Sequence, residues 1–308
     1  MKKIYLALYL ATGCLFATTA ISQDNQPPAW GPEMARVIVG ASPYSSADIT
    51  IPVQVFKPSK DQAGQTKEKW PVVIFSHGRS GSPASRAAQK NPVSLNVVRY
   101  WLSKGYAVVA AIRPGYGDNT SEDPEDHGAR PGGSSCTGRA DFDKTANAAS
   151  HAVKAVHAWL ISQNWVDQNH LLLVGQSVGG LATVAACAQN WPGVRGCINF
   201  AGGTGGNPNT SPGHSCRPDR LGAVLSNFAK TTKVPSLWLY SANDKYWGEE
   251  APKVWFKAFT DAARAAGQTA PAEFFAAPPV GDDGHLLQNM GGRFWFPAVN
   301  AWLAQNGL

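Results

Sequence analysis

The chain has 308 residues, of which 44% are hydrophobic and 16% are charged, so it is long and apolar enough to bury a large core. Its formal net charge is +6 at pH 7, but Lys and Arg are scattered and form no basic block, which gives no support for nucleic-acid binding. The sequence has no tandem repeat that would indicate a repeat protein.

The N-terminus reads as a targeting segment. Two lysines precede the apolar run 4–11, and the small residues at 18–20 offer a cleavage site. We therefore predict a secretory signal peptide over 1–20, one folded domain over 21–308, and a secreted or periplasmic protein. The apolar stretch is a poor membrane span. A lipid anchor at Cys14 is the alternative to ordinary cleavage.

Eight strands are predicted from apolar and β-rich runs, and six helices from the stretches between them. The strands lie near 36–40, 49–57, 71–76, 106–112, 171–174, 196–201, 235–240 and 273–277, and the helices near 93–104, 142–163, 178–189, 219–229, 250–266 and 294–304. Strands that alternate with helices indicate an α/β fold, here a mostly parallel eight-stranded sheet with helices on both faces. The first two strands have no helix between them, so we predict an antiparallel hairpin at the edge.

The third predicted strand ends in a glycine turn, His77-Gly78-Arg79-Ser80-Gly81. A loop at this place can aim a backbone N–H at an oxygen that gains negative charge during a reaction. We assign that role to the N–H of Arg79. We expect His77 to make local hydrogen bonds that fix the loop, rather than to act as a base.

A long loop follows the fourth predicted strand, beginning at Arg113 and running to Cys136. It is long enough to form a lid or a pocket wall. Within it, Tyr116 can stack on an aromatic or sugar group, and Arg113 or Arg130 can pair with a carboxylate, so we predict these three as substrate-binding residues. Packing is the alternative for the aromatic ring. The acidic segment 122–126 lacks the ligand spacing of a calcium loop, and we expect it to be solvated.

The most informative motif is Gly175-Gln176-Ser177-Val178-Gly179, between the apolar run 171–174 and the small-residue run 181–188. This context predicts a strand, a sharp turn and a helix, with Ser177 in a strained conformation at the turn. The two glycines remove Cβ atoms that would collide as strand meets helix. Ser177 is then the predicted nucleophile, and the N–H of Val178 is the second donor to the oxyanion.

A serine nucleophile needs a base and a carboxylate that orients it, and candidates for both follow in the chain. Asp244 comes after the seventh predicted strand and His285 after the eighth. The alternative for Asp244 is a turn residue that binds its own backbone. Asp282 and Asp283 are runner-up acids, which we expect only to shape the loop. Trp247 is a fourth substrate-binding candidate, with packing again as the alternative.

Four stretches together resemble the α/β-hydrolase superfamily, and within it the dienelactone hydrolase-like and secreted serine esterase branch: 77–78, 175–180, 237–244 and 284–285. The resemblance covers roughly residue 35 to the end and implies one α/β-hydrolase catalytic domain over 21–308. Dienelactone hydrolases proper carry a cysteine nucleophile where this chain has Ser177, so their lactone substrate is not carried over. The resemblance implies ester hydrolysis.

The predicted reaction is acyl transfer in two steps. His285 takes the proton of Ser177, the serine attacks an ester carbonyl, and water then releases the acid, with Asp244 facing the imidazolium. The predicted substrate is a small-molecule or polymer-borne ester, and we predict no metal and no cofactor. A serine peptidase or amidase with the same three residues is one alternative, and a non-catalytic binding protein on a hydrolase scaffold is another.

Removal of the signal peptide leaves four cysteines, an even number that fits an oxidising compartment. Cys187 and Cys197 bracket a Pro-Gly turn, so we predict a disulfide between them, which leaves Cys136 to pair with Cys216. Buried free thiols are the alternative. No pair of cysteines has the spacing of a metal site.

Overall fold

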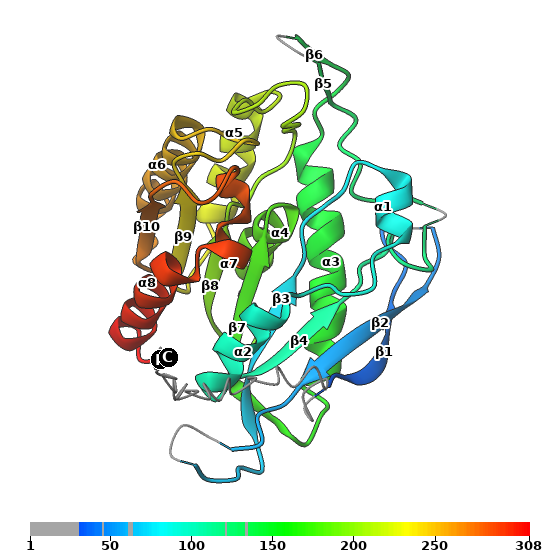
Figure 1. Cartoon of the computed structure of the whole chain (residues 1–308), viewed down its shortest axis with the longest axis vertical. Helices are drawn as coiled ribbons and strands as arrows, with labels where there is room; N and C mark the ends of the chain where they lie inside the picture. The colour runs from blue at the N-terminus through cyan, green and yellow to red at the C-terminus, as the bar shows by residue number, and fades with distance from the viewer. Residues whose placement is uncertain (1–30, 45, 61–63, 121, 133–134) are drawn as a thin grey trace, which may run out of the picture. The chain divides into compact units, whose positions relative to one another are not determined.

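The structure, a computed structural model, describes residues 31–44, 46–60, 64–120, 122–132 and 135–308. The predicted signal peptide over 1–20 and Cys14 lie outside the described residues. Figure 1 shows a sheet in the middle of the described chain with helices on both of its faces.

Eight strands form the main sheet, in the order β1-β2-β4-β3-β7-β8-β9-β10. Their bounds are β1 (Glu33–Val39), β2 (Ile49–Phe56), β3 (Trp70–Ser76), β4 (Ala107–Ala111), β7 (Val166–Gln176), β8 (Val194–Phe200), β9 (Ser236–Ser241) and β10 (Ala272–Ala277). All eight predicted strands are present, and the prediction of an α/β fold with a mostly parallel sheet is confirmed.

The direction of the strands decides where functional side chains meet. β1 and β2 form the antiparallel hairpin predicted for the edge, and β2 is also antiparallel to β4. From β4 to β10 all neighbouring strands are parallel. Parallel strands end at one edge of a sheet, where sites of this fold class form. The segments after β3, β7, β9 and β10 carry His77, Ser177, Asp244 and His285.

The six predicted helices are all present, and three short ones were not predicted. The helices are α1 (Pro83–Ala87), α2 (Leu95–Ser103), α3 (Phe142–Leu160), α4 (Val178–Cys187), α5 (Pro218–Ala229), α6 (Glu250–Ala265), η1 (Gly284–Leu286), α7 (Leu287–Met290) and α8 (Gly292–Gln305). Within the described residues, none of these helices has the length and apolar character needed to cross a membrane.

Two residues of β8 that lie three positions apart show which helices cover which face of the sheet. Side chains of a strand alternate between the two faces, so residues an odd number of positions apart point to opposite faces. Cys197 forms a disulfide with Cys187 of α4. Phe200 instead contacts Trp295 of α8, with ring centroids 5.1 Å apart. Helices α4 and α8 therefore cover opposite faces, as Figure 1 shows.

The core consists mainly of two clusters of buried apolar side chains. One joins β1–β4, β7 and α3, and includes Trp70, Val109 and Leu160. The other joins α4, α5, α6 and β9, and includes Trp238 and Phe259. β4 is buried along its whole length, as expected for a parallel strand with helices on both faces.

The long loop predicted between β4 and α3 contains a small hairpin. Its strands β5 (Arg130–Gly132) and β6 (Ser135–Thr137) pair antiparallel and are separate from the main sheet. A disulfide joins Cys136 of β6 to Cys216, with the Cα atoms 5.5 Å apart, and a second joins Cys187 to Cys197, with the Cα atoms 6.5 Å apart. Both predicted pairings are present.

Candidate active site

Ser177 lies between β7 and α4 in a conformation that few residues adopt. Its backbone angles are φ 58° and ψ −125°, a region that is unfavourable for any residue with a Cβ. The surrounding backbone holds it there: its N–H donates to the carbonyl of Phe200 at 2.9 Å, and its carbonyl accepts from Leu181 at 3.0 Å and Gly203 at 3.2 Å. The strained turn predicted from the sequence is therefore present and anchored to the end of β8.

The glycines on either side of Ser177 are required by close packing. A Cβ at Gly175 would collide with the carbonyl oxygen of Gly179, and a Cβ at Gly179 would collide with the carbonyl oxygen of Ser76 at the end of β3. Gly78 packs less tightly but also lies against this turn, because a Cβ there would lie 2.7 Å from Oε1 of Gln176 and 3.3 Å from Cβ of Ser177. The glycine turn after β3 is thus pressed against the serine turn.

Asp244 and His285 meet at the same edge of the sheet. Nδ1 of His285 lies 3.0 Å from Oδ2 and 3.2 Å from Oδ1 of Asp244, and both residues are buried. Oδ1 of Asp244 also accepts the N–H groups of Tyr246 at 2.7 Å and Trp247 at 3.1 Å. Asp244 therefore binds its own turn and the histidine at once, and Nε2 is the ring nitrogen left over.

The loops that carry these two residues are tied together by Asp283. Its Oδ1 accepts the N–H of His285 at 2.9 Å and the N–H of Lys245 at 3.0 Å. Gln176, next to the serine, donates to the carbonyl of His285 at 3.2 Å. The prediction that Asp283 shapes the loop is confirmed, although its sequence context did not show that it spans both loops.

Two aromatic rings confine the imidazole of His285. The ring of Tyr246 stacks on it with centroids 4.0 Å apart, and Trp247 meets it edge-on at 5.4 Å. Trp247 is 2% exposed and donates its indole N–H to the carbonyl of Ala201 at 2.8 Å. The sequence spacing of Tyr246 gives no sign of this stacking on His285.

His77 fixes the glycine turn after β3, as predicted. Its Nδ1 lies 2.7 Å from the carbonyl of Gly78, and its Nε2 accepts the N–H of Arg113 at 3.3 Å. Burial, and then the charge of Arg113, lowers the pKa of His77 to about 3, so the ring is neutral at physiological pH. Both of its nitrogens are occupied.

A cavity of about 780 Å³ opens beside Ser177. Arg79 and Val178, the two predicted oxyanion donors, line it together with the serine. Val178 is the first residue of α4, where a backbone N–H has no intrahelical partner. The rest of the lining comes from five stretches: 80–83 with Arg86, 123–127 in part, 129–131, 204–209 and 246–247.

The sequence matches no family model and no curated protein. Solved structures do match: an acylaminoacyl peptidase of Pyrococcus horikoshii (17% identity, TM-score 0.56, 87% of this chain and 41% of that chain), a Klebsiella pneumoniae protein described as a dienelactone hydrolase (16%, 0.54, 90% and 98%) and Est1E of Butyrivibrio proteoclasticus (14%, 0.53, 90% and 98%). This chain has the α/β-hydrolase fold. It spans 36% to 41% of the length of the peptidases that it matches.

Two of the predicted substrate-binding residues of this chain lie outside the cavity, which corrects the prediction. Arg113 is 1% exposed and forms a two-pronged ion pair with Glu125, at 2.6 and 3.1 Å. Tyr116 is 2% exposed, and its hydroxyl donates to Glu125 at 2.8 Å. Neither residue lines the cavity. The reason is physical: a buried carboxylate needs a cation and hydrogen-bond donors, and these two residues supply them.

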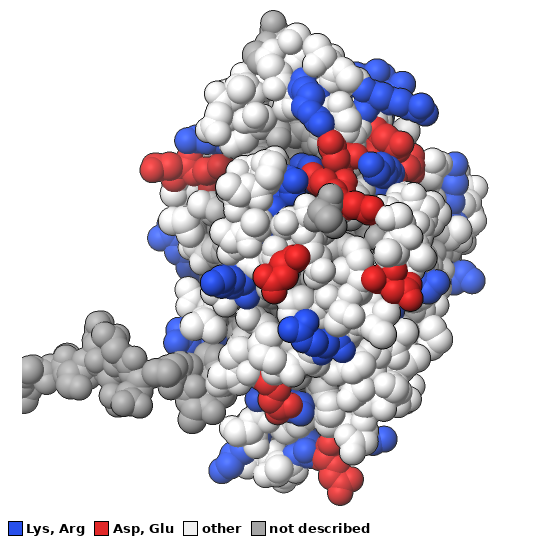
Figure 2. Space-filling view, turned by 90° about the vertical axis from the view of Figure 1, so that its right-hand side faces the viewer, with Lys and Arg blue, Asp and Glu red and all other residues white. Residues whose placement is uncertain are grey.

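The acidic segment is correspondingly not a solvated loop. Glu125 is buried, and although burial opposes its ionisation, Arg113 brings its pKa below the usual range. Asp123 accepts from Arg79 at 2.6 Å and lies 3.2 Å from Arg86. Figure 2 shows acidic side chains lying among basic ones on this side of the molecule. Residues 122–126 are thus mostly paired with arginines.

The other two predicted substrate-binding residues, Arg130 and Trp247, do line the cavity. Arg130 pairs with Asp126 at 2.7 Å, and this hydrogen bond is the largest cause that lowers the pKa of Asp126. Among the described residues the lining carries three arginines and two aspartates, so its formal charge is +1. His127 adds none near pH 7, since burial and then Arg79 lower its pKa to about 4.

Proposed function

We propose that this α/β-hydrolase cleaves carboxylic esters, with Ser177 as nucleophile, His285 as base and Asp244 as the acid that orients the base. The observation that carries the proposal is the 3.0 Å contact between Nδ1 of His285 and Asp244, at the same sheet edge as the strained serine. The chain order Ser, Asp, His supports it. A buried histidine held by a buried aspartate has no evident structural use at this place.

In the proposed mechanism, Asp244 occupies Nδ1 of the imidazole, which leaves Nε2 to take the proton of Ser177. The serine oxygen attacks the ester carbonyl, and the N–H groups of Arg79 and Val178 bind the oxyanion that forms. His285 then protonates the leaving alcohol. Water, activated by the same histidine, releases the acid and restores the serine.

A fluorophosphonate probe tests the nucleophile, because it reacts with an activated serine and not with an ordinary one. We expect labelling of the peptide that contains Ser177, detected by mass spectrometry, and no labelling of Ser177→Ala. Ser162→Ala, which changes an exposed serine in the turn after α3, is the matched control and should be labelled like the parent. A folded parent protein without label would favour the non-catalytic scaffold.

A serine peptidase or amidase is the second candidate, because the solved structures that match include peptidases. The geometry of the three residues serves either reaction. Turnover of an ester and an amide with the same acyl group separates them: an ester specificity constant more than 10³ times that of the amide supports the esterase, and comparable constants support the peptidase.

For the substrate, we propose an ester, free or borne on a polymer, whose side groups contact Arg130 and Trp247. Both residues line the cavity, and its formal charge of +1 favours a substrate with a carboxylate. Trp247 is nearly buried, so it does not offer an open stacking platform.

We also propose that the protein is exported, to the periplasm or out of the cell. Support comes from the two disulfides, which persist in oxidising compartments, and from the predicted signal peptide over 1–20. Fractionation of the native host with an antibody against the chain tests this proposal, and recovery in the cytosol would contradict it.

A further inference from the structure

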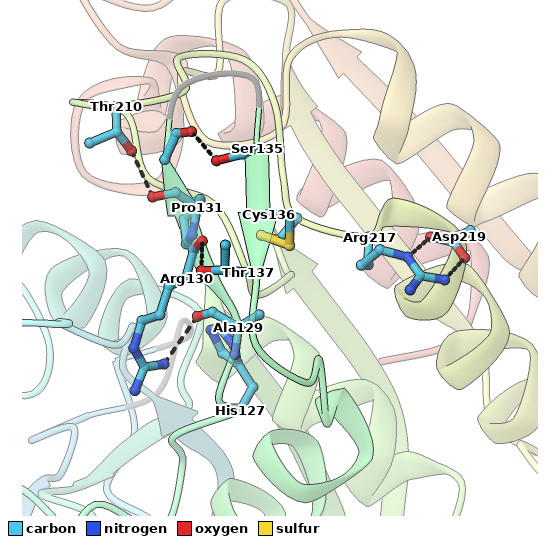
Figure 3. Close-up of a disulfide and its surroundings, with 12 residues drawn as sticks. His127, Ala129, Arg130, Pro131, Ser135, Cys136, Thr137, Thr210, Arg217 and Asp219 are labelled. Atoms are coloured by element: carbon cyan, nitrogen blue, oxygen red, sulfur yellow. Dashed lines mark hydrogen bonds and ion pairs between the residues drawn. A yellow bond between two sulfur atoms is a disulfide. The ribbon is translucent and has the colours of Figure 1, made fainter.

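The cavity beside Ser177 has a wall that is made by two stretches far apart in the sequence. One stretch is 129–131, at the start of the β5–β6 hairpin, and the other is 204–209, which follows β8. Figure 3 shows Pro131 of the first stretch beside Thr210, which directly follows the second stretch, with Cys136 of the disulfide close by. The width of this part of the cavity therefore depends on what keeps the two stretches together.

Two links join the hairpin to the segment that follows β8. One is the disulfide from Cys136 to Cys216, and the other is a hydrogen bond of 3.1 Å from the hydroxyl of Thr210 to the carbonyl of Pro131. The covalent link reaches the cavity lining almost directly, because the N–H of Cys216 donates to the carbonyl of Gly205 at 2.8 Å. A displacement of Cys216 would therefore displace Gly205, which lines the cavity.

Among the described residues of the hairpin, burial holds its base at Ala129 and not its strands. None of the six residues that form its strands is buried, and an isolated two-stranded hairpin is marginal in water. The ion pair of Arg130 with Asp126 lies on the hairpin's own loop and leaves the arginine side chain 60% exposed. The disulfide is the covalent tie between the hairpin and the 204–216 segment, beside the hydrogen bond from Thr210 to Pro131.

The second disulfide is in a different situation. Cys187 and Cys197 are each 1% exposed and lie within the larger core cluster, where many apolar contacts hold the same elements. Neither lines the cavity. Loss of this disulfide is expected to affect stability and not the shape of the site, so it is an internal control for the first.

We propose that the Cys136–Cys216 disulfide determines specificity: it holds the hairpin against the 204–216 segment and so sets the width of the cavity between 129–131 and 204–209. The proposal rests on the proposed hydrolase function. When a dithiol reduces the disulfide, two electrons and two protons pass to the sulfurs, the S–S bond breaks, and the reductant becomes a disulfide. The hairpin is then free to move away, which admits bulkier groups and weakens contact with small ones.

The test compares Cys136→Ser/Cys216→Ser with the matched control Cys187→Ser/Cys197→Ser, on 4-nitrophenyl butyrate and 4-nitrophenyl dodecanoate. We expect the ratio of kcat/KM for the long ester to that for the short ester to rise at least tenfold in the first variant and to stay within twofold in the control. A ratio that stays within twofold in both variants would overturn the proposal.

A second measurement removes the risk that the first variant fails to fold. The exposed Cys136 of the parent protein should react with dithiothreitol before the buried pair does, and limited proteolysis should then cut within 129–138. Absence of new cleavage after reduction of Cys136, as shown by thiol mapping, would also overturn the proposal. Fluorophosphonate labelling of Ser177 is a separate readout: its absence would count against the hydrolase function and not against the tie itself.

Discussion

The edge of the sheet and the wall of the cavity are built in different ways. At the edge, Ser177, Asp244 and His285 are buried, and the ends of strands and neighbouring backbone groups hold each of them. The wall formed by the loop after β4 is anchored at its base by a buried ion pair and at its tip by one disulfide, with exposed residues between. The edge is therefore held by the fold itself, whereas the wall is held by two separate attachments, a buried ion pair and a disulfide.

Asp244→Asn changes the carboxylate that contacts His285 at the edge of the sheet, and it should have the largest effect on activity. The amide keeps the shape of the side chain but favours the wrong tautomer of His285, so we expect kcat to fall about 10³- to 10⁴-fold. Steady-state kinetics with a short ester, together with circular dichroism to check folding, measures it. A loss of less than tenfold would mean that another carboxylate orients the imidazole.

Arg113→Met removes the buried ion pair with Glu125 that anchors the loop after β4. It leaves the buried Glu125 without its cation, so we expect the free energy of unfolding to fall by about 3–5 kcal/mol, measured by urea denaturation. The double variant Arg113→Met/Glu125→Met should recover most of this loss. Arg217→Met removes an exposed pair with Asp219 and should change stability little. Equal losses in all three variants would contradict an anchoring role for the buried pair.

The base of the wall also makes stability depend on pH. The pKa values of His77 and His127 are lowered to about 3 and about 4, mainly by burial, whereas the unfolded chain binds these protons near pH 6.5. The unfolded state therefore holds more protons between pH 6.5 and 4, and the free energy of unfolding should fall as pH falls through this window. Urea denaturation at pH 7.5, 6 and 5 measures it. His77→Gln should show a smaller slope, and equal slopes would count against this cause.

Asp283→Ala should have the smallest effect. It tests whether Asp283 positions His285 at the edge of the sheet without taking part in the reaction. It removes the acceptor shared by the N–H groups of His285 and Lys245, so the loop of the base loosens and kcat should fall roughly tenfold. The adjacent Asp282 is exposed, and Asp282→Ala is the matched control, expected within twofold of the parent. If both variants have the same kcat, the hydrogen bonds of Asp283 do not position His285.

The sequence was sufficient to predict which residues lie at the edge of the sheet. It was insufficient to predict the contacts in the wall of the cavity. The positions of Ser177, Asp244 and His285 follow strand ends, and strand ends are visible in the apolar pattern, so their place at one edge of the sheet was predictable. Both disulfides were predictable from spacing and number. The sequence could not show that Arg113 and Glu125, read as parts of two separate motifs, are partners in one buried ion pair.

The same limit explains the smaller misses. The β5–β6 hairpin has strands of three residues, too short for an alternating pattern to emerge. The stacking of Tyr246 on His285 brings together residues of two loops, and no periodicity within either loop records it. Contacts between irregular segments are set by tertiary structure, which pattern analysis of one chain does not reach.

The two ends of the segment that carries the hairpin are neighbours in space. The N–H of Asp141 donates to the carbonyl of His127 at 2.9 Å, and a Cβ at Gly138 would collide with the carbonyl of Gly128. The intervening stretch leaves and rejoins the body at nearly one point, like an insert on a closed stem. The insert can therefore be lengthened, shortened or exchanged without a change in the backbone from which it leaves.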